Sequence, residues 1–138
     1  MKLELITLTG EKLSTDVYEV TIPTTAGEIS VFPGHIPLVT IARDGVLYVR
    51  VKKTDRDEDR EVFAINGGVV QIDQRTVRIL VDEADAAGEI ATREVEAALA
   101  RAKEMREKAK DAVSISEAEA LMNRAATRLK VAGLRRRR

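Results

Sequence analysis

Apolar and polar residues alternate along the first part of the chain, and the alternation recurs in short runs. The clearest runs place apolar residues at Leu3 and Leu5, Val20 and Ile22, Ile29 and Val31, Val49 and Val51, and Val77, Ile79 and Val81. A period of two is typical of strands that bury one face. The turn signals between the runs include Thr9-Gly10, Pro33-Gly34 and Asn66-Gly67. This pattern predicts about eight to ten short strands in an antiparallel β-sandwich.

The pattern changes at residues 84–88, and from Thr92 onward apolar residues recur every three or four positions. This spacing predicts an amphipathic helix of about 20 residues, roughly 30 Å long. Residues 111–114 interrupt it. Ser116 and Glu119 then form a capping box that predicts the start of a second helix, and Gly133 occupies the place of its C-terminal cap. We therefore expect two domains, a β-sandwich at residues 1–86 and an antiparallel helical hairpin at residues 87–138.

Composition removes several classes of function. The chain of 138 residues has no Cys and one His, which excludes thiol chemistry and makes a multi-His metal site impossible. Aromatic residues make up only 3%, so base stacking on nucleic acid is not expected. No segment has the roughly 20 apolar residues that span a bilayer, and the N-terminus does not resemble a signal peptide. We expect a soluble protein that stays on the cytosolic side.

The charges are divided unevenly although the net charge is zero. Residues 1–89 carry 10 Lys and Arg against 16 Asp and Glu, whereas residues 90–138 carry 13 against 7. Residues 135–138 are consecutive arginines, a composition that also occurs in nucleic-acid binding tails. We interpret them as a solvated tail, because the acidic first part would repel nucleic acid.

Several motifs together resemble one family. Residues 27–40 (GEISVFPGHIPLVT) resemble the signature loop of the epsilon subunit of F-type, rotary ATP synthases. Residues 64–72 (AINGGVVQI) are similar to the family's Gly-Gly strand motif, residues 77–84 (VRILVDEA) to its final strand, and residues 123–129 (NRAATRL) to its last helix. The resemblance covers essentially the whole chain in the right order.

This resemblance implies a non-catalytic subunit of the central stalk of a proton-translocating synthase. The sandwich would dock on the gamma subunit and the c-subunit ring, with Glu28 and His35 as candidate ring contacts. The hairpin would either fold against the sandwich or extend to the alpha and beta subunits and inhibit ATP hydrolysis. Neither a metal nor nucleic acid is implied. The protein would be peripheral to the membrane through the complex, on the cytoplasmic face of the bacterial plasma membrane.

The resemblance also bears on nucleotide binding. Some family members bind ATP on the folded hairpin through (Ile or Leu)-Asp-x-x-Arg-Ala at the start of the first helix. Here Ala91 replaces the Asp and Glu94 replaces the Arg. Basic residues that match or neighbour the family positions remain, and these regulatory candidates are Arg93, Arg101, Arg124 and Arg128. We therefore expect no cofactor and at most weak ATP binding.

Other interpretations stay open on the residues alone. The segment from Pro33 to Pro37 also fits a rigid turn, because Pro fixes φ and Gly tolerates positive φ. Gly67 and Gly68 fit a close approach between strands, and the charged residues 52–61 fit a hairpin tip. A sandwich that binds its own ligand and dimerises through the hairpin would have the same pattern. Stable association with a gamma subunit would distinguish the rotor subunit from such a module.

Overall fold

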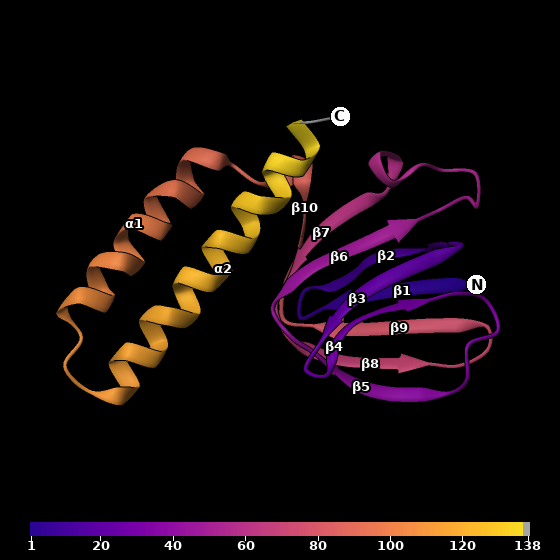
Figure 1. Ribbon diagram of the computed structural model, residues 1–138, viewed down its shortest axis with the longest axis horizontal. Helices are drawn as coiled ribbons and strands as arrows, with labels where there is room; N and C mark the ends of the chain where they lie inside the picture. The colour runs from indigo at the N-terminus through magenta and orange to yellow at the C-terminus, as the bar shows by residue number, and fades with distance from the viewer. Residues whose placement is uncertain (137–138) are drawn as a thin grey trace.

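The computed structural model describes the backbone of residues 1–136 and the side chains of residues 1–134 (Figure 1). Within this range, ten strands precede two α-helices; the 3₁₀ turn η1 lies between β6 and β7, and η2 lies between β10 and α1. The strands are β1 (Lys2–Thr7), β2 (Gly10–Asp16), β3 (Glu19–Thr24), β4 (Gly27–Val31), β5 (Leu38–Ala42), β6 (Gly45–Arg50), β7 (Glu61–Ile65), β8 (Gly68–Ile72), β9 (Thr76–Val81) and β10 (Ala84–Ala86). The remaining elements are η1 (Asp57–Asp59), η2 (Ala87–Glu89), α1 (Thr92–Lys108) and α2 (Ala112–Arg136). The predicted β-sandwich followed by a helical hairpin is confirmed.

The strands form one continuous ladder in the order β10-β7-β6-β3-β5-β8-β9-β1-β2, with β4 paired to β3. All neighbours are antiparallel except β1 and β9, which are parallel. Only Thr24 and Ala42 join β3 to β5, so the ladder folds over at this point into two layers. One layer contains β10, β7, β6, β3 and β4, and the other contains β5, β8, β9, β1 and β2.

Inward-facing residues of the alternating runs fill the space between the layers, as a period of two dictates. Aliphatic side chains dominate this core, and those with no exposed surface include Leu3, Leu5, Val20, Ile22, Val31, Leu47, Val49, Val70, Val77 and Ile79. Gly68 is required by this packing. A Cβ at Gly68 would lie 1.8 Å from the carbonyl oxygen of Leu80 on the neighbouring strand. The interpretation of the Gly-Gly pair as a close approach between strands is therefore correct.

The helical boundaries differ from the sequence prediction. Helix α1 has 17 residues rather than about 20. Helix α2 begins at Ala112, four residues before the predicted capping box, because the carboxylate of Asp111 accepts hydrogen bonds from the backbone N–H and the hydroxyl of Ser114 (2.8 and 3.1 Å). The helix also continues through Gly133, which is not a C-terminal cap. The buried Val131 and Ala132 before Gly133 and the partly buried Leu134 after it hold the backbone helical.

The hairpin packs against the outer face of β6 and β7, and α2 lies nearer the sandwich than α1 (Figure 1). A second apolar cluster forms there, separate from the sandwich core. Its buried members are Val46, Val62 and Ala64 from the strands, Ile90 from the linker, Val95 from α1, and Ala125, Val131 and Ala132 from α2. The arginine run at residues 135–138, interpreted above as a solvated tail, lies outside the described side chains.

Candidate functional site

The signature segment forms β4 and the loop that connects it to β5. Phe32 packs edge to face on Tyr18, with ring centroids 5.7 Å apart and planes at 70°. Gly34 has a φ of 87°, a conformation that favours glycine. Nδ1 of His35 lies 2.6 Å from the carbonyl oxygen of Ile36. The loop is thus an ordered turn, and His35 is hydrogen-bonded within it.

The structure does not bring Glu28 and His35 together. Glu28 is exposed near the start of β4, opposite Pro23 of β3. His35 lies beyond the other end of β4 and is half-buried. Among the described residues β4 pairs only with β3, so its other edge is free. Contact with one partner would therefore have to extend along the length of β4.

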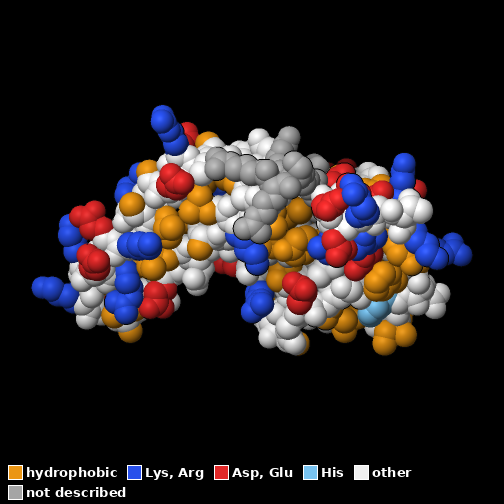
Figure 2. Space-filling view, turned by 45° about the horizontal axis from the view of Figure 1, so that its top comes forward, with side chains coloured by type: hydrophobic (Ala, Val, Ile, Leu, Met, Phe, Trp, Pro, Cys, Tyr) orange, Lys and Arg blue, Asp and Glu red, His pale blue; other side chains and the backbone are white. Residues whose placement is uncertain are grey.

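An exposed apolar surface covers the outer face of the second layer. Ile41 of β5 pairs with Val69 of β8, which in turn pairs with Leu80 of β9. Their side chains are exposed by 57%, 41% and 37%, and Val39 on β5 is exposed by 70%. We define Val39, Ile41, Val69 and Leu80 as the apolar strip. The neighbouring loop adds the exposed Ile36, and Figure 2 shows hydrophobic side chains gathered around the single histidine.

The sequence analysis did not identify this strip. Strands β5 and β8 carry apolar residues on both faces, with Ile41 outside and Ala42 inside, and Val69 outside and Val70 inside. The signal that could have indicated the strip is therefore the presence of consecutive apolar residues in these strands, where a half-exposed strand would alternate apolar with polar residues. Contiguous exposed apolar surface of this kind is typical of a protein interaction site.

Three of the four basic candidates line one cleft between the helices. The cleft has a volume of about 220 Å³ and is bordered by Arg101 of α1 and by Arg124 and Arg128 of α2. Its apolar wall consists of Val95, Ala98, Ala102, Met105, Leu121 and Ala125. Figure 2 shows hydrophobic side chains between the helices with Lys or Arg side chains beside them. The cleft thus combines an apolar wall with three guanidinium groups at its border.

The first turn of α1 lies apart from that cleft. Ala91 precedes the helix without a side-chain cap, and Arg93 and Glu94 are both exposed. None of these three residues lines the cleft. The fourth basic candidate, Arg93, is therefore not grouped with the other three.

Two ion pairs join the helical part to the sandwich. Nε of Arg128 on α2 lies 3.3 Å from Oδ2 of Asp85 on β10, and Lys12 of β2 pairs with Glu89 of η2. The Arg128 contact is an ion pair by distance but not a hydrogen bond, since the buried Nε lacks a hydrogen-bond acceptor. Asp85 is one of the residues that the sequence analysis missed, because it is 43 positions from its partner and belongs to no motif.

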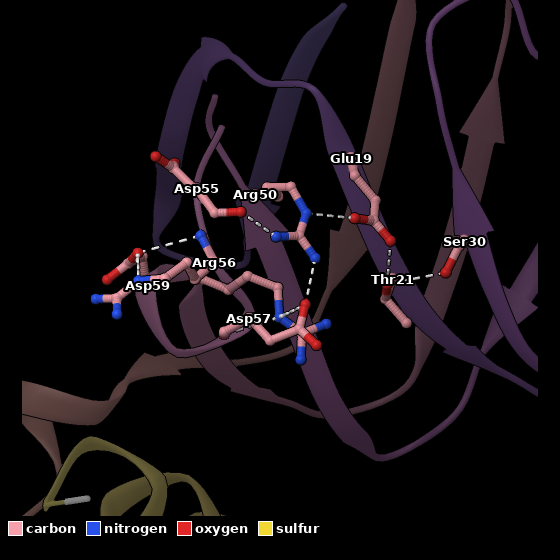
Figure 3. A network of polar contacts seen from close by, with 9 residues as sticks. Glu19, Thr21, Ser30, Arg50, Asp55, Arg56, Asp57 and Asp59 are labelled. Atoms are coloured by element: carbon pink, nitrogen blue, oxygen red, sulfur yellow. Dashed lines mark hydrogen bonds and ion pairs between the residues drawn. The ribbon is translucent and has the colours of Figure 1, made fainter. Parts of the chain in front are cut away.

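The charged loop between β6 and β7 is held by a polar network (Figure 3). Arg50 donates through Nε to Glu19 (2.7 Å) and also pairs with Asp57. The hydrogen bond from Arg50 lowers the pKa of Asp57, and the hydrogen bond to Glu19 is the main cause that raises the pKa of Arg50. Arg60 lies 4.4 Å from the centre of the Tyr48 ring. The predicted hairpin tip is present, and these contacts order it.

Comparison with known proteins now identifies the family. The model of the ATP synthase Delta/Epsilon chain beta-sandwich domain matches residues 1–87. The ATP synthase epsilon chain of Staphylococcus aureus (strain JH9) is 37% identical over 136 residues, which cover 98% of each chain. The chain belongs to the ATP synthase epsilon-chain family. The chain of Staphylococcus aureus (strain Newman) has the same identity and coverage.

Solved structures support the fold of this family member. A chain in the Euglena gracilis mitochondrial ATP synthase (OSCP/F1/c-ring, rotational state 1) superposes with a TM-score of 0.77 at 24% identity, over 91% of this chain and 76% of that one. A chain in the Tetrahymena thermophila mitochondrial ATP synthase (central stalk/c-ring) gives 0.60 at 17% identity, over 96% of both chains. Within residues 1–136, neither helix has the length and hydropathy needed to cross a membrane.

Proposed function

We propose that this chain is the central-stalk epsilon subunit of a proton-translocating F-type ATP synthase. In this role it couples the c-subunit ring to the gamma subunit and restrains ATP hydrolysis through its C-terminal helices, without supplying a catalytic group. The observation that carries the proposal is the 37% identity to epsilon chains across 98% of both chains, which includes sandwich and hairpin alike. The protein is then a peripheral component of the complex on the cytoplasmic face of the bacterial plasma membrane.

Docking on gamma is supported by the apolar strip. The strip lies on the layer that the hairpin leaves uncovered, so a partner can occupy it whether the hairpin is folded or open. Replacing Ile41 with Lys would place a charge at the centre of such an interface, where an unpaired charge opposes binding. Leu8→Lys is a suitable control, since Leu8 is 81% exposed but lies on the turn between β1 and β2. Gamma should copurify with the control and be lost from Ile41→Lys; equal recovery contradicts this assignment.

Contact with the c-subunit ring is assigned to the free edge of β4, with Glu28 and His35 as its polar contacts. Glu28→Lys reverses an exposed charge without disturbing the core. We expect slower proton-driven ATP synthesis in reconstituted vesicles and unchanged ATPase activity of the soluble complex. Glu11→Lys, an equally exposed reversal on β2, is the matched control. Equal synthesis rates for both variants would exclude Glu28 from the ring contact.

The hairpin is assigned the regulatory role. Its segment, residues 90–138, carries the excess of basic residues, which suits acidic surfaces of the alpha and beta subunits. Arg101, Arg124 and Arg128 line a cleft in the folded hairpin, where Arg124 and Arg128 are half-buried, so opening would expose these two further to such surfaces. A hairpin of this kind acts as a switch only if its partners bind one of the two states more tightly.

Hydrolysis by the core complex tests this role at equal occupancy of four chains. The chains are full length, truncated after Gly88, Arg124→Gln with Arg128→Gln, and Lys103→Gln with Lys130→Gln. The lysines are exposed charges on the same helices outside the cleft and serve as the matched control. Truncation should release inhibition fully, the arginine pair in part, and the lysine pair not at all. Identical hydrolysis rates for all four chains would mean that the hairpin does not inhibit ATP hydrolysis.

Nucleotide binding is proposed to be absent or weak. Ala91 and Glu94 replace the family's ligand pair, and the exposed Glu94 adds negative charge to the first turn of α1. Titration calorimetry of the isolated chain with ATP should show no tight site. The double variant Ala91→Asp with Glu94→Arg restores the two family residues and should gain affinity. Micromolar or tighter binding by the unmodified chain would overturn this prediction.

A further inference from the structure

One charged contact crosses the otherwise apolar boundary between α2 and the sandwich. The apolar part of this boundary includes Val62 and Ala64 of β7 and Ala125, Val131 and Ala132 of α2. Beside it, Arg128 of α2 reaches Asp85 of β10. In the part of the chain whose side chains are described, no other ion pair links α2 to the sandwich. This ion pair therefore joins the hairpin directly to the sandwich and can contribute to docking of α2.

The environment of this pair differs from that of a surface ion pair. The side chains of Arg128 and Asp85 are exposed by only 33% and 28%. For comparison, Arg106 and Glu119 form a pair between α1 and α2 at 3.1 Å, with exposures of 42% and 55%. A charge that is partly withdrawn from water depends more on its partner than an exposed one, because water no longer compensates for its loss.

The two residues also separate when the hairpin opens. Asp85 belongs to β10, which pairs with β7 through Ala84, Asp85 and Ala86, so Asp85 stays with the sandwich. Arg128 belongs to α2 and moves with the hairpin. Arg128 also lines the cleft between the helices with Arg101 and Arg124. Asp85 thus neutralises one of three neighbouring cations only while the hairpin is folded.

We propose that Asp85 is an internal latch that holds the hairpin in its folded state by binding Arg128. Opening the hairpin breaks the ion pair and releases the guanidinium group to acidic partners. The latch is a property of the isolated chain, while its effect on hydrolysis rests on the function proposed above. In this chain the carboxylate contributes to the folded state without a nucleotide.

Hydrogen exchange of the isolated full-length chain tests the latch. The variants are Asp85→Asn, Arg128→Gln and the double substitution, and the readout is the exchange of amides in α2 relative to those in β1 and β9. Each single variant should raise the opening constant of the hairpin by about three- to tenfold. The double variant should be no more open than the single variants, because neither residue has a partner left to lose.

Arg106→Gln and Glu119→Gln provide the matched control, since their ion pair lies within the hairpin and does not cross to the sandwich. They should leave the exchange of amides in the docked part of α2, residues 125–132, at the wild-type rate. Wild-type exchange in the Asp85 and Arg128 variants, or additive effects in the double variant, would refute the latch. Copurification with gamma separates the two proposals. If the wild-type chain does not copurify with gamma, the rotor function is contradicted while the latch, a property of the isolated chain, still stands.

Discussion

Docking of the hairpin should depend most on the buried apolar side chains of α2, and Val131 tests this. Val131 lies one helical turn beyond Arg128 and has no exposed surface within the second apolar cluster. Val131→Ala removes two methyl groups, worth about 1.6 kcal/mol at about 0.8 kcal/mol per buried carbon. The cavity that remains adds to this cost, whereas Ala favours the helix by about 0.5 kcal/mol more than Val. The net loss should be about 2 kcal/mol.

A loss of about 2 kcal/mol corresponds to a roughly 30-fold larger opening constant, since 1.4 kcal/mol is a factor of ten. The assay is native-state hydrogen exchange, in which amides of α2 report opening while amides of β1 and β9 report unfolding of the sandwich. Val113→Ala is the control, because it makes the same chemical change in the same helix at a side chain that is 67% exposed. Equal exchange in the two variants would refute the assignment of docking to the buried cluster.

Three further outcomes follow from local geometry. Gly68→Ala should destabilise the sandwich by about 3 kcal/mol or more in denaturant unfolding, because its Cβ would lie 1.8 Å from the backbone oxygen of Leu80. Gly133→Ala should instead stabilise α2 by about 0.5–1 kcal/mol, since no atom lies within 4 Å of its added Cβ; destabilisation would mean that Gly133 is needed for packing. The hydrogen bonds from Ser114 hold the pKa of Asp111 below its ordinary value of 3.8, so its contribution to α2 is complete above that pH and is lost as the pH falls through the folded-state pKa. Asp111→Asn should keep the cap but remove this acid dependence of helicity, as measured by circular dichroism.

The sandwich could be predicted from the sequence because its signal is local. Alternation such as Leu3 and Leu5 or Val77 and Ile79 determines which side chains face inward, and turn residues mark the ends of the strands. The outer apolar strip could not be found in the same way. In β5 and β8 both faces carry apolar residues, so the pattern does not distinguish the face that packs from the face that remains exposed.

The predictions of where α2 begins and ends were wrong for two different physical reasons. Asp111 and Ser116 are both good N-cap residues, and local sequence does not decide between two caps in the same short segment. At the other end, the low helix propensity of glycine predicts a stop at Gly133. Burial of Val131 and Ala132 in the second apolar cluster outweighs that preference, and this burial depends on residues far away in the sequence. The pairing of Asp85 with Arg128 could not be predicted for the same reason, because the two residues are far apart in the sequence.

The two outer faces of the sandwich differ in the side chains that they present, and only one of them is covered by the hairpin. The face under the hairpin presents Val46, Val62 and Ala64, and α2 meets it largely with small side chains. The alanines among these residues bury little area each, so docking depends mainly on the valines. The opposite layer keeps the larger Ile41 and Leu80 exposed and is not altered when the hairpin moves. A partner could thus stay bound to the apolar strip while the hairpin opens, and differential contacts worth about 5.5 kcal/mol would suffice to shift the hairpin from 99% folded to 99% open.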